Sequence, residues 1–194
     1  MMNNRFYLVL LVFFVVLNQS CMHRKNYGEL KMKILKKGDY LTKITQDTLK
    51  KELFVAIGSK GVANAVEYCK LNAHLITSIY KSENVNSVTR TALKFRNPQN
   101  APDSLERSVL NEYESLKNNG EPLNPTVISD ESGIHYFKPI LINNTCLVCH
   151  GSPGKELNNQ VYEQIKNNYP DDLATGFKEG DLRGMWHVVF NEKE

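Results

Sequence analysis

The residues with the clearest chemistry are Cys146, Cys149 and His150, in the last quarter of the 194-residue chain. Two thiols separated by two residues and followed directly by an imidazole form the pattern by which a c-type haem is attached. In that chemistry the sulfurs form thioethers with the porphyrin vinyl groups, and the adjoining imidazole binds the iron. The Cys-x-x-Cys part alone is also typical of a thiol redox pair or half of a zinc site. The complete pattern favours one covalently attached haem c, with His150 as an axial ligand.

The N-terminal residues predict that the chain is exported. Arg5 precedes an apolar run over residues 6–17, which has the length found in signal peptides and is short for a transmembrane helix. We therefore predict a signal peptide over residues 1–20, followed by lipidation of Cys21, which would hold the protein at a membrane. The alternatives are a soluble exported protein and an uncleaved anchor. In bacteria c-type haem is attached outside the cytoplasm, so a periplasmic or cell-envelope location agrees with the cysteine motif.

Cys69 is the expected second axial ligand. It lies on the apolar stripe of a predicted helix, with Val66 one turn before it and Ala73 one turn after it. The ordinary role of a lone cysteine is that of a small buried hydrophobic side chain. A free thiol in an exported protein has no reducing buffer around it, so iron ligation would explain its presence. The competing candidates are His74, His135, Met185 and His187.

Composition limits the other classes of function. The net charge of +3 comes from 24 basic and 21 acidic residues, which excludes the strongly basic surface of a nucleic-acid-binding protein. The length suits one domain with a proper core, which we place at residues 38–194. Residues 21–37 are predicted to be a solvated basic tether, because they contain Arg24, Lys25, Lys31, Lys33, Lys36 and Lys37.

The remaining pattern predicts an α+β fold. Residues 30–80 have helical periodicity, as one long helix or as two separated near residues 58–61. The cysteine motif then lies on a loop just beyond a sheet edge. The other expected elements are strands at 87–96, 126–129, 134–140 and 182–190, a hairpin turn at 130–133, and helices from Asp103 or Ser104 to 118 and over 155–168.

Several blocks of the sequence together resemble the bacterial family of exported single-haem c-type proteins, long known as a domain of unknown function. The resemblance implies a PAS-like antiparallel sheet with a long N-terminal helix and short flanking helices. It also implies His150 and Cys69 as the two axial iron ligands. The blocks are Ala65–Cys69; Arg96-Asn97-Pro98 with Asn100, Pro102-Asp103 and Glu106; Cys146–Gly151; and Tyr169–Asp172 with Ala174, Gly176, Gly180-Asp181 and Arg183-Gly184.

Arg96 and Arg183 have two interpretations. Each can be a solvated charge or form an ion pair with Asp103, Glu106 or Asp181, or each can bind a haem propionate, because the guanidinium fork suits a carboxylate.

The expected function is electron transfer or redox reporting with an unidentified redox partner, and not catalysis, because two protein ligands leave no open position on the iron. A thiolate ligand would also lower the reduction potential relative to His/Met ligation. The first alternative is a redox or gas sensor that acts through a separate partner. Thiol–disulfide exchange at Cys146 and Cys149 is a weaker alternative, because the sequence predicts no strand-to-helix setting for the pair.

Overall fold

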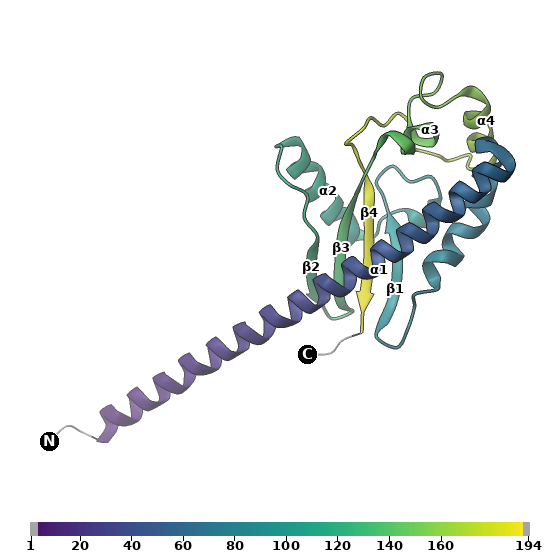
Figure 1. The fold of residues 1–194 in the computed structure, drawn as a ribbon. Coiled ribbons are helices and arrows are strands. Elements are labelled where there is room, and N and C mark those ends of the chain that lie inside the picture. Colours follow the sequence, from purple (N-terminus) through teal and green to yellow (C-terminus); the bar gives the residue numbers. More distant parts are fainter. Residues whose placement is uncertain (1–3, 192–194) are drawn as a thin grey trace.

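The computed structural model describes the backbone of residues 4–191 and the side chains of residues 28–191. The described residues form several helices and one four-stranded antiparallel sheet (Figure 1). This arrangement confirms the predicted α+β, PAS-like fold with a long N-terminal helix. The elements are α1 (Asn4–Ser78), β1 (Val85–Thr91), η1 (Pro98–Asn100), α2 (Ser104–Asn118), β2 (Thr126–Asp130), β3 (Gly133–Leu141), η2 (Asn144–Cys146), α3 (Leu147–His150), α4 (Asn159–Asn168) and β4 (Leu182–Phe190).

The last strand lies inside the sheet. The strand order is β1-β4-β3-β2 and every neighbouring pair is antiparallel. Alternate residues of β4 therefore point to opposite faces, and both faces are buried. Helix α1 crosses one face and α2 covers the other, while α3 and α4 lie at one end of the sheet (Figure 1).

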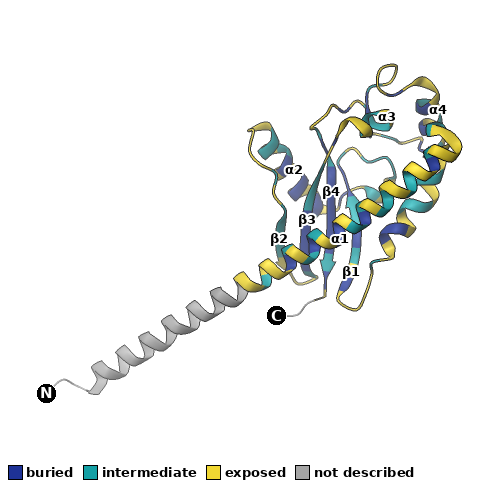
Figure 2. Cartoon of the chain, in the orientation of Figure 1, coloured by how far each residue is buried: buried dark blue, intermediate teal, exposed yellow. Residues whose placement is uncertain are grey.

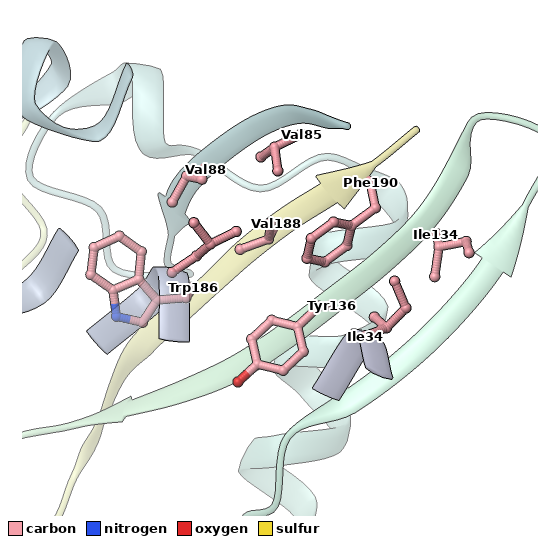
Figure 3. Packing of buried hydrophobic residues seen from close by; sticks show 9 residues of the cluster. Ile34, Val85, Val88, Ile134, Tyr136, Trp186, Val188 and Phe190 are labelled. Carbon is pink, nitrogen blue, oxygen red and sulfur yellow. The ribbon is translucent and has the colours of Figure 1, made fainter. Parts of the chain in front are cut away.

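The larger core cluster lies between α1 and the sheet. Ile34 of α1 packs among Tyr136, Trp186, Val188 and Phe190 with no more than 2% of any of these residues exposed (Figure 3). Gly38 allows this close approach, because a Cβ atom there would overlap the ring of Tyr136. The inner side of α1 is accordingly buried and its outer side exposed (Figure 2). The core on the opposite face contains Val109, Leu110, Tyr113, Phe137, Leu182 and Met185.

Helix α1 is two helices joined at Gly61. The backbone of Gly61 leaves the helical region, with φ 78° and ψ 164°, and the chain then folds back beside its first part. Tyr68 donates a hydrogen bond to Glu52 at 2.9 Å across this hairpin. Of the two sequence predictions for residues 30–80, the pair of helices is therefore correct.

The basic tether and the domain start at residue 38 need correction. Residues 28–37 belong to α1, and Ile34 is fully buried against the sheet. The packed domain thus begins before residue 38. The lysines misled the prediction, because lysines can line the outer side of a helix whose inner side is apolar. The predicted signal peptide at 1–20 and lipidation at Cys21 lie outside the residues whose side chains are described. None of the helices in the described part of the chain is both long and apolar enough for a membrane span.

Local signals predicted most element boundaries correctly. Helix α2 begins at a capping box in which Asp103 and Glu106 bond each other's backbone amides, and β2 and β3 form the expected hairpin. The strand predicted to reach residue 96 ends at Thr91, because the amide of Ala92 bonds the carbonyl of Asn100 at 3.1 Å and leaves the sheet.

Candidate functional site

The cysteine motif is held in a helical turn at the end of β3. Asn143 caps the turn, since its Oδ1 atom accepts hydrogen bonds from the amide and the thiol of Cys146 at 3.2 and 3.1 Å. Cys149 and His150 follow in α3, so the three functional side chains have the i, i+3, i+4 spacing that places them on one side of a helix. The prediction that the motif lies on a loop is corrected accordingly.

The tautomer of His150 is fixed by its hydrogen bond to the backbone. Its Nδ1 atom is 2.7 Å from the carbonyl oxygen of Ala174, and a carbonyl only accepts, so Nδ1 carries the proton and Nε2 keeps its lone pair. Burial lowers the pKa of His150 well below its usual value, and the charges of Arg183 and Arg96 lower it further. The ring of Phe177 stands edge-on to the imidazole at 6.2 Å. A neutral imidazole held through Nδ1 is the usual form of a metal-binding histidine.

The loop before β4 closes over the motif through its backbone. The amide of Phe177 donates to the carbonyl of His150 at 3.0 Å, and the amide of Gly176 donates to the carbonyl of Gly151 at 2.9 Å. Gly151 has no room for a side chain, because a Cβ atom would lie 2.7 Å from the carbonyl oxygen of Leu147. The loop that holds the imidazole is thereby tied to the segment that carries it.

Arg96 joins these segments. Its guanidinium group donates to Asp172 at 3.1 Å, to the carbonyl of Cys149 at 2.6 Å and to the carbonyl of Ala174 at 3.1 Å. The side chains of Arg96 and Asp172 are only 13% and 1% exposed. Arg96 therefore orients both the cysteine motif and the Ala174 carbonyl that accepts the hydrogen bond from His150.

The ion-pair partners predicted for the arginines were wrong. Asp103 and Glu106 cap α2, Glu106 also pairs with His187, and Asp181 pairs with Lys117 at 3.3 Å. Arg183 instead donates to the carbonyl of Lys94 at 3.1 Å and lies over the ring of Phe177 at 5.7 Å.

Cys69 lies on the part of α1 that faces α4. Val66, one turn earlier, belongs to a buried cluster with Leu157 and Val161, and Cys149 packs against the same cluster. Cys69, Cys146 and Cys149 are partly buried free thiols. Burial raises the pKa of Cys69, and the positive charges of Arg90 and Arg96 oppose that increase. The fold thus brings the helical turn that carries Cys69 close to Cys149, although the two cysteines are far apart in sequence.

The competing ligands have other environments. His74 is exposed, and Met185 is fully buried in the core beneath α2. His135 and His187 lie on the α2 face of the sheet, where their rings hydrogen-bond each other at 2.9 Å. His187 also bonds Glu106 at 2.8 Å. These two histidines are satisfied core residues.

Two alternative chemistries of the cysteine pair lose support. The part of the chain whose side chains are described contains no group of three or more His, Cys, Asp or Glu residues suited to a metal ion, so a second half of a zinc site is not found there. The pair does follow a strand and enter a short helix, contrary to our prediction for thiol exchange. Burial nevertheless raises the pKa of Cys149, whereas a reactive thiol requires a lowered one.

The sequence analysis missed Asn143 and Arg90. Asn143 carries a cap signal, because Asn is favoured at the start of a helical turn. Arg90 lies two residues after buried Val88 in β1, so it occupies a position where the strand pattern predicts an apolar side chain. A charge at such a position is a signal of a buried polar contact.

The fold and site define a class of protein: a PAS-like α+β domain with a Cys-x-x-Cys-His turn anchored at one end of its sheet. The family model described as Tll0287-like matches residues 17–191, and the chain belongs to this family. A solved structure described as the crystal structure of the cyanobacterial heme-protein Tll0287 is similar, with 26% identity and a TM-score of 0.57 over 82% of this chain and 97% of that chain. A search of curated proteins found no match. The family resemblance predicted from the sequence is confirmed.

Proposed function

We propose that this chain is a c-type haem protein. Cys146 and Cys149 would attach one haem through thioethers, and Nε2 of His150 would bind its iron. The observation that carries the proposal is the 2.7 Å hydrogen bond from His150 Nδ1 to the Ala174 carbonyl. It leaves the lone pair of Nε2 available to bind iron, next to two cysteines that could attach the haem covalently. The solved relative, described as a heme-protein, supports the same cofactor.

In this proposal Cys69 would be the second protein ligand of the iron. It is a free thiol one helical turn after Val66, whose buried cluster Cys149 contacts, and it lies within electrostatic range of Cys149 and of the positive charges of Arg90 and Arg96. His74, His135, Met185 and His187 lack this combination. Iron held by two protein ligands supplies one-electron redox chemistry, so the proposed role is electron transfer or redox reporting with a separate redox partner, and not catalysis.

The proposed location is outside the cytoplasm, in the periplasm or cell envelope, with a lipid on Cys21 as the membrane anchor. The apolar run at residues 6–17 and the cysteine that follows support this proposal. Mass spectrometry of the mature protein tests it, because lipidation leaves Cys21 as the modified first residue. A mature protein that begins at another residue would disprove the lipid anchor.

Haem attachment is tested by producing the protein in cells with c-type maturation machinery. We expect a red protein whose haem stays bound after denaturation and gives the pyridine haemochrome spectrum of thioether-linked haem. A colourless protein in which Cys146 and Cys149 titrate as free thiols would disprove the proposal.

The ligand assignment is tested by electron paramagnetic resonance of the ferric protein. Cys69→Ala should lose the wild-type low-spin signal and bind carbon monoxide readily when reduced, because one axial position is opened. The matched control is His74→Ala, an exposed neighbour on the same helix, which should keep the wild-type spectrum. An unchanged signal in Cys69→Ala would exclude Cys69 as a ligand. Ready carbon monoxide binding by the wild-type protein would favour a sensor.

A further inference from the structure

A chain of side-chain hydrogen bonds runs between two carboxylates on the face of the sheet that α2 covers. Nδ1 of His187 lies 2.8 Å from Glu106 on α2, and Nε2 of His187 lies 2.9 Å from Nδ1 of His135. Nε2 of His135 lies 3.0 Å from Asp130 at the end of β2. Both rings are buried, with 5% of His135 and 6% of His187 exposed. The proposed haem chemistry uses none of these four residues.

Glu106 sets the tautomers of both rings. Burial raises the pKa of Glu106, but the hydrogen bonds from His187 and the Asp103 amide lower it more, so the carboxylate is ionised near neutral pH. A carboxylate only accepts, so Nδ1 of His187 carries a proton. Nε2 of a neutral His187 then accepts from Nδ1 of His135. A neutral His135 is therefore left with a lone pair on Nε2, the atom that faces Asp130.

The Asp130 end of the chain has too few protons in that neutral form. Asp130 Oδ1, Ser132 Oγ and His135 Nε2 form a triangle with sides of 2.6, 2.9 and 3.0 Å. The hydroxyl of Ser132 supplies one hydrogen for these three contacts. The hydroxyl and the amide of Ser132 lower the pKa of Asp130 to about 2, so the carboxylate supplies none. The lone pairs of Asp130 and His135 would then face each other, and a proton on Nε2 removes this conflict.

The groups around the two rings suit that added proton. The charged groups that contact the rings are the carboxylates of Glu106, from α2, and Asp130, from β2. From β1, Thr89 donates to the carbonyl of His187 at 3.3 Å, and from β3 the ring of Phe137 stacks on His187 with centroids 4.4 Å apart. A buried charge requires an opposite partner, and an imidazolium at His135 has one in Asp130. Histidine is also the side chain whose charge ordinarily changes near neutral pH.

We propose that Nε2 of His135 is a proton-binding site whose occupancy decides whether the β2–β3 turn is bonded to the ring. With the proton bound, Nε2 and the hydroxyl of Ser132 both donate to Asp130. When the proton leaves, the hydroxyl of Ser132 turns to the lone pair of Nε2, and Asp130 is released from the ring. The turn at residues 130–133 thereby responds to pH, while the bond between Glu106 and His187 stays. This inference goes beyond the proposed haem attachment and does not rest on it.

Nuclear magnetic resonance of the purified protein tests the site. The histidine nitrogens are isotope-labelled, and the protein is reduced with dithionite so that any low-spin iron is diamagnetic. At about pH 6 both nitrogens of His135 should carry protons, and between about pH 6 and pH 9 Nε2 should lose its proton while Nδ1 of both rings keeps one. The amide of Ser132 donates to Asp130 at 2.7 Å and should change with the same midpoint. His74 is exposed and should titrate separately.

Asp130→Asn removes the opposite charge but keeps the oxygen that accepts from the Ser132 amide. The midpoint of the His135 transition should fall by about one pH unit in this variant, a tenfold weaker hold on the proton. The matched control is Glu131→Gln, which removes the same charge from the exposed neighbour in the same turn and should keep the wild-type midpoint. The side chain of Asp130 is 43% exposed, so Asp130→Asn should leave the fold intact.

Two results would overturn this inference. The first is a wild-type His135 ring with a lone pair on Nε2 at about pH 6, because the site is then empty where it should be occupied. The second is an equal midpoint in the wild type and in Asp130→Asn, because Asp130 then does not hold the proton. Neither result bears on haem attachment, which the absorption spectrum of the same sample reports separately.

Discussion

At the scale of single residues, Arg96 has the widest influence on the candidate site. Its side chain bonds the backbone of Cys149 in the cysteine motif, and Asp172 and the backbone of Ala174 in the loop before β4, two segments that are distant from Arg96 in sequence. The carbonyl of Ala174 in turn holds His150. A change at Arg96 should therefore alter the position of the His150 imidazole without touching the imidazole itself.

Replacement of Arg96 by glutamine should lower the free energy of unfolding by about 3 kcal/mol, because it leaves the buried carboxylate of Asp172 without its charge partner. Urea denaturation measures the loss. The double variant Arg96→Gln/Asp172→Asn should lose less than the sum of the single variants, since the two residues form one pair. Arg107→Gln is the control, and a loss of stability at Arg96 no larger than at Arg107 would contradict the stabilising role of the Arg96–Asp172 pair.

At the scale of elements, a buried polar chain connects α2 to the sheet. Glu106 in the first turn of α2 accepts a hydrogen bond from Nδ1 of His187 on β4, and His187 bonds His135 on β3. Nε2 of His135 lies 3.0 Å from Asp130 at the hairpin turn. Helix α2 is thus joined to β4 and β3 by hydrogen bonds through Glu106, His187 and His135.

Glu106 should make the stability of the protein depend on pH. Burial alone raises its pKa, but the hydrogen bonds from His187 and from the Asp103 amide lower it more, so the pKa lies below 4.5. A carboxylate with a lowered folded pKa stabilises the protein above its unfolded pKa, and this contribution is lost as the pH falls through the folded value. The unfolding free energy of the wild type should therefore decrease on acidification below about pH 4.5.

Urea denaturation between about pH 6 and pH 3 measures this dependence. Glu106→Gln should flatten it, because glutamine keeps the capping box but does not ionise. Glu112→Gln, an exposed change on the same helix, is the control and should follow the wild type. Equal acid dependence in the wild type and in Glu106→Gln would disprove the assignment.

At the scale of the whole molecule, the fold-back of α1 decides where Cys69 lies. The first part of the helix covers the sheet, and the second part, after Gly61, packs against α4 beside the cysteine motif (Figure 1). The backbone angles of Gly61 belong to a region open almost only to glycine. The relation between Cys69 and His150 therefore depends on one residue in a solvent-exposed bend.

Gly61→Ala should cost about 1 to 3 kcal/mol of stability through backbone strain, since no neighbouring atom would touch the new methyl group. It should also weaken the low-spin ferric signal, because the second helix is displaced. Gly58→Ala lies three residues earlier in regular helix with open space around it, and it should stabilise by up to about 1 kcal/mol. Thermal unfolding and electron paramagnetic resonance measure both variants, and equal effects would contradict the role of the bend.

Features that depend on neighbours in sequence were predicted well. The capping box of Asp103 and Glu106 and the turn at residues 130–133 involve groups a few residues apart, so their energetics are contained in short segments. The basic run before residue 38 was misjudged for the converse reason. Its lysines suggested solvent exposure, whereas Ile34 is buried by side chains of β1, β3 and β4, which are all distant from it in sequence.

The sequence by itself determined the chemistry available to this protein, because the spacing of Cys146, Cys149 and His150 is a local property of one helical turn. It also indicated Cys69 through helical periodicity. Only the tertiary structure decided that Arg96 pairs with Asp172, that the Ala174 carbonyl sets the tautomer of His150, and that Arg183 donates to the Lys94 carbonyl. These outcomes depend on which distant segments pack together and on how much water they exclude. A short stretch of sequence contains neither the identity of the segments that pack against it nor the extent to which they exclude water.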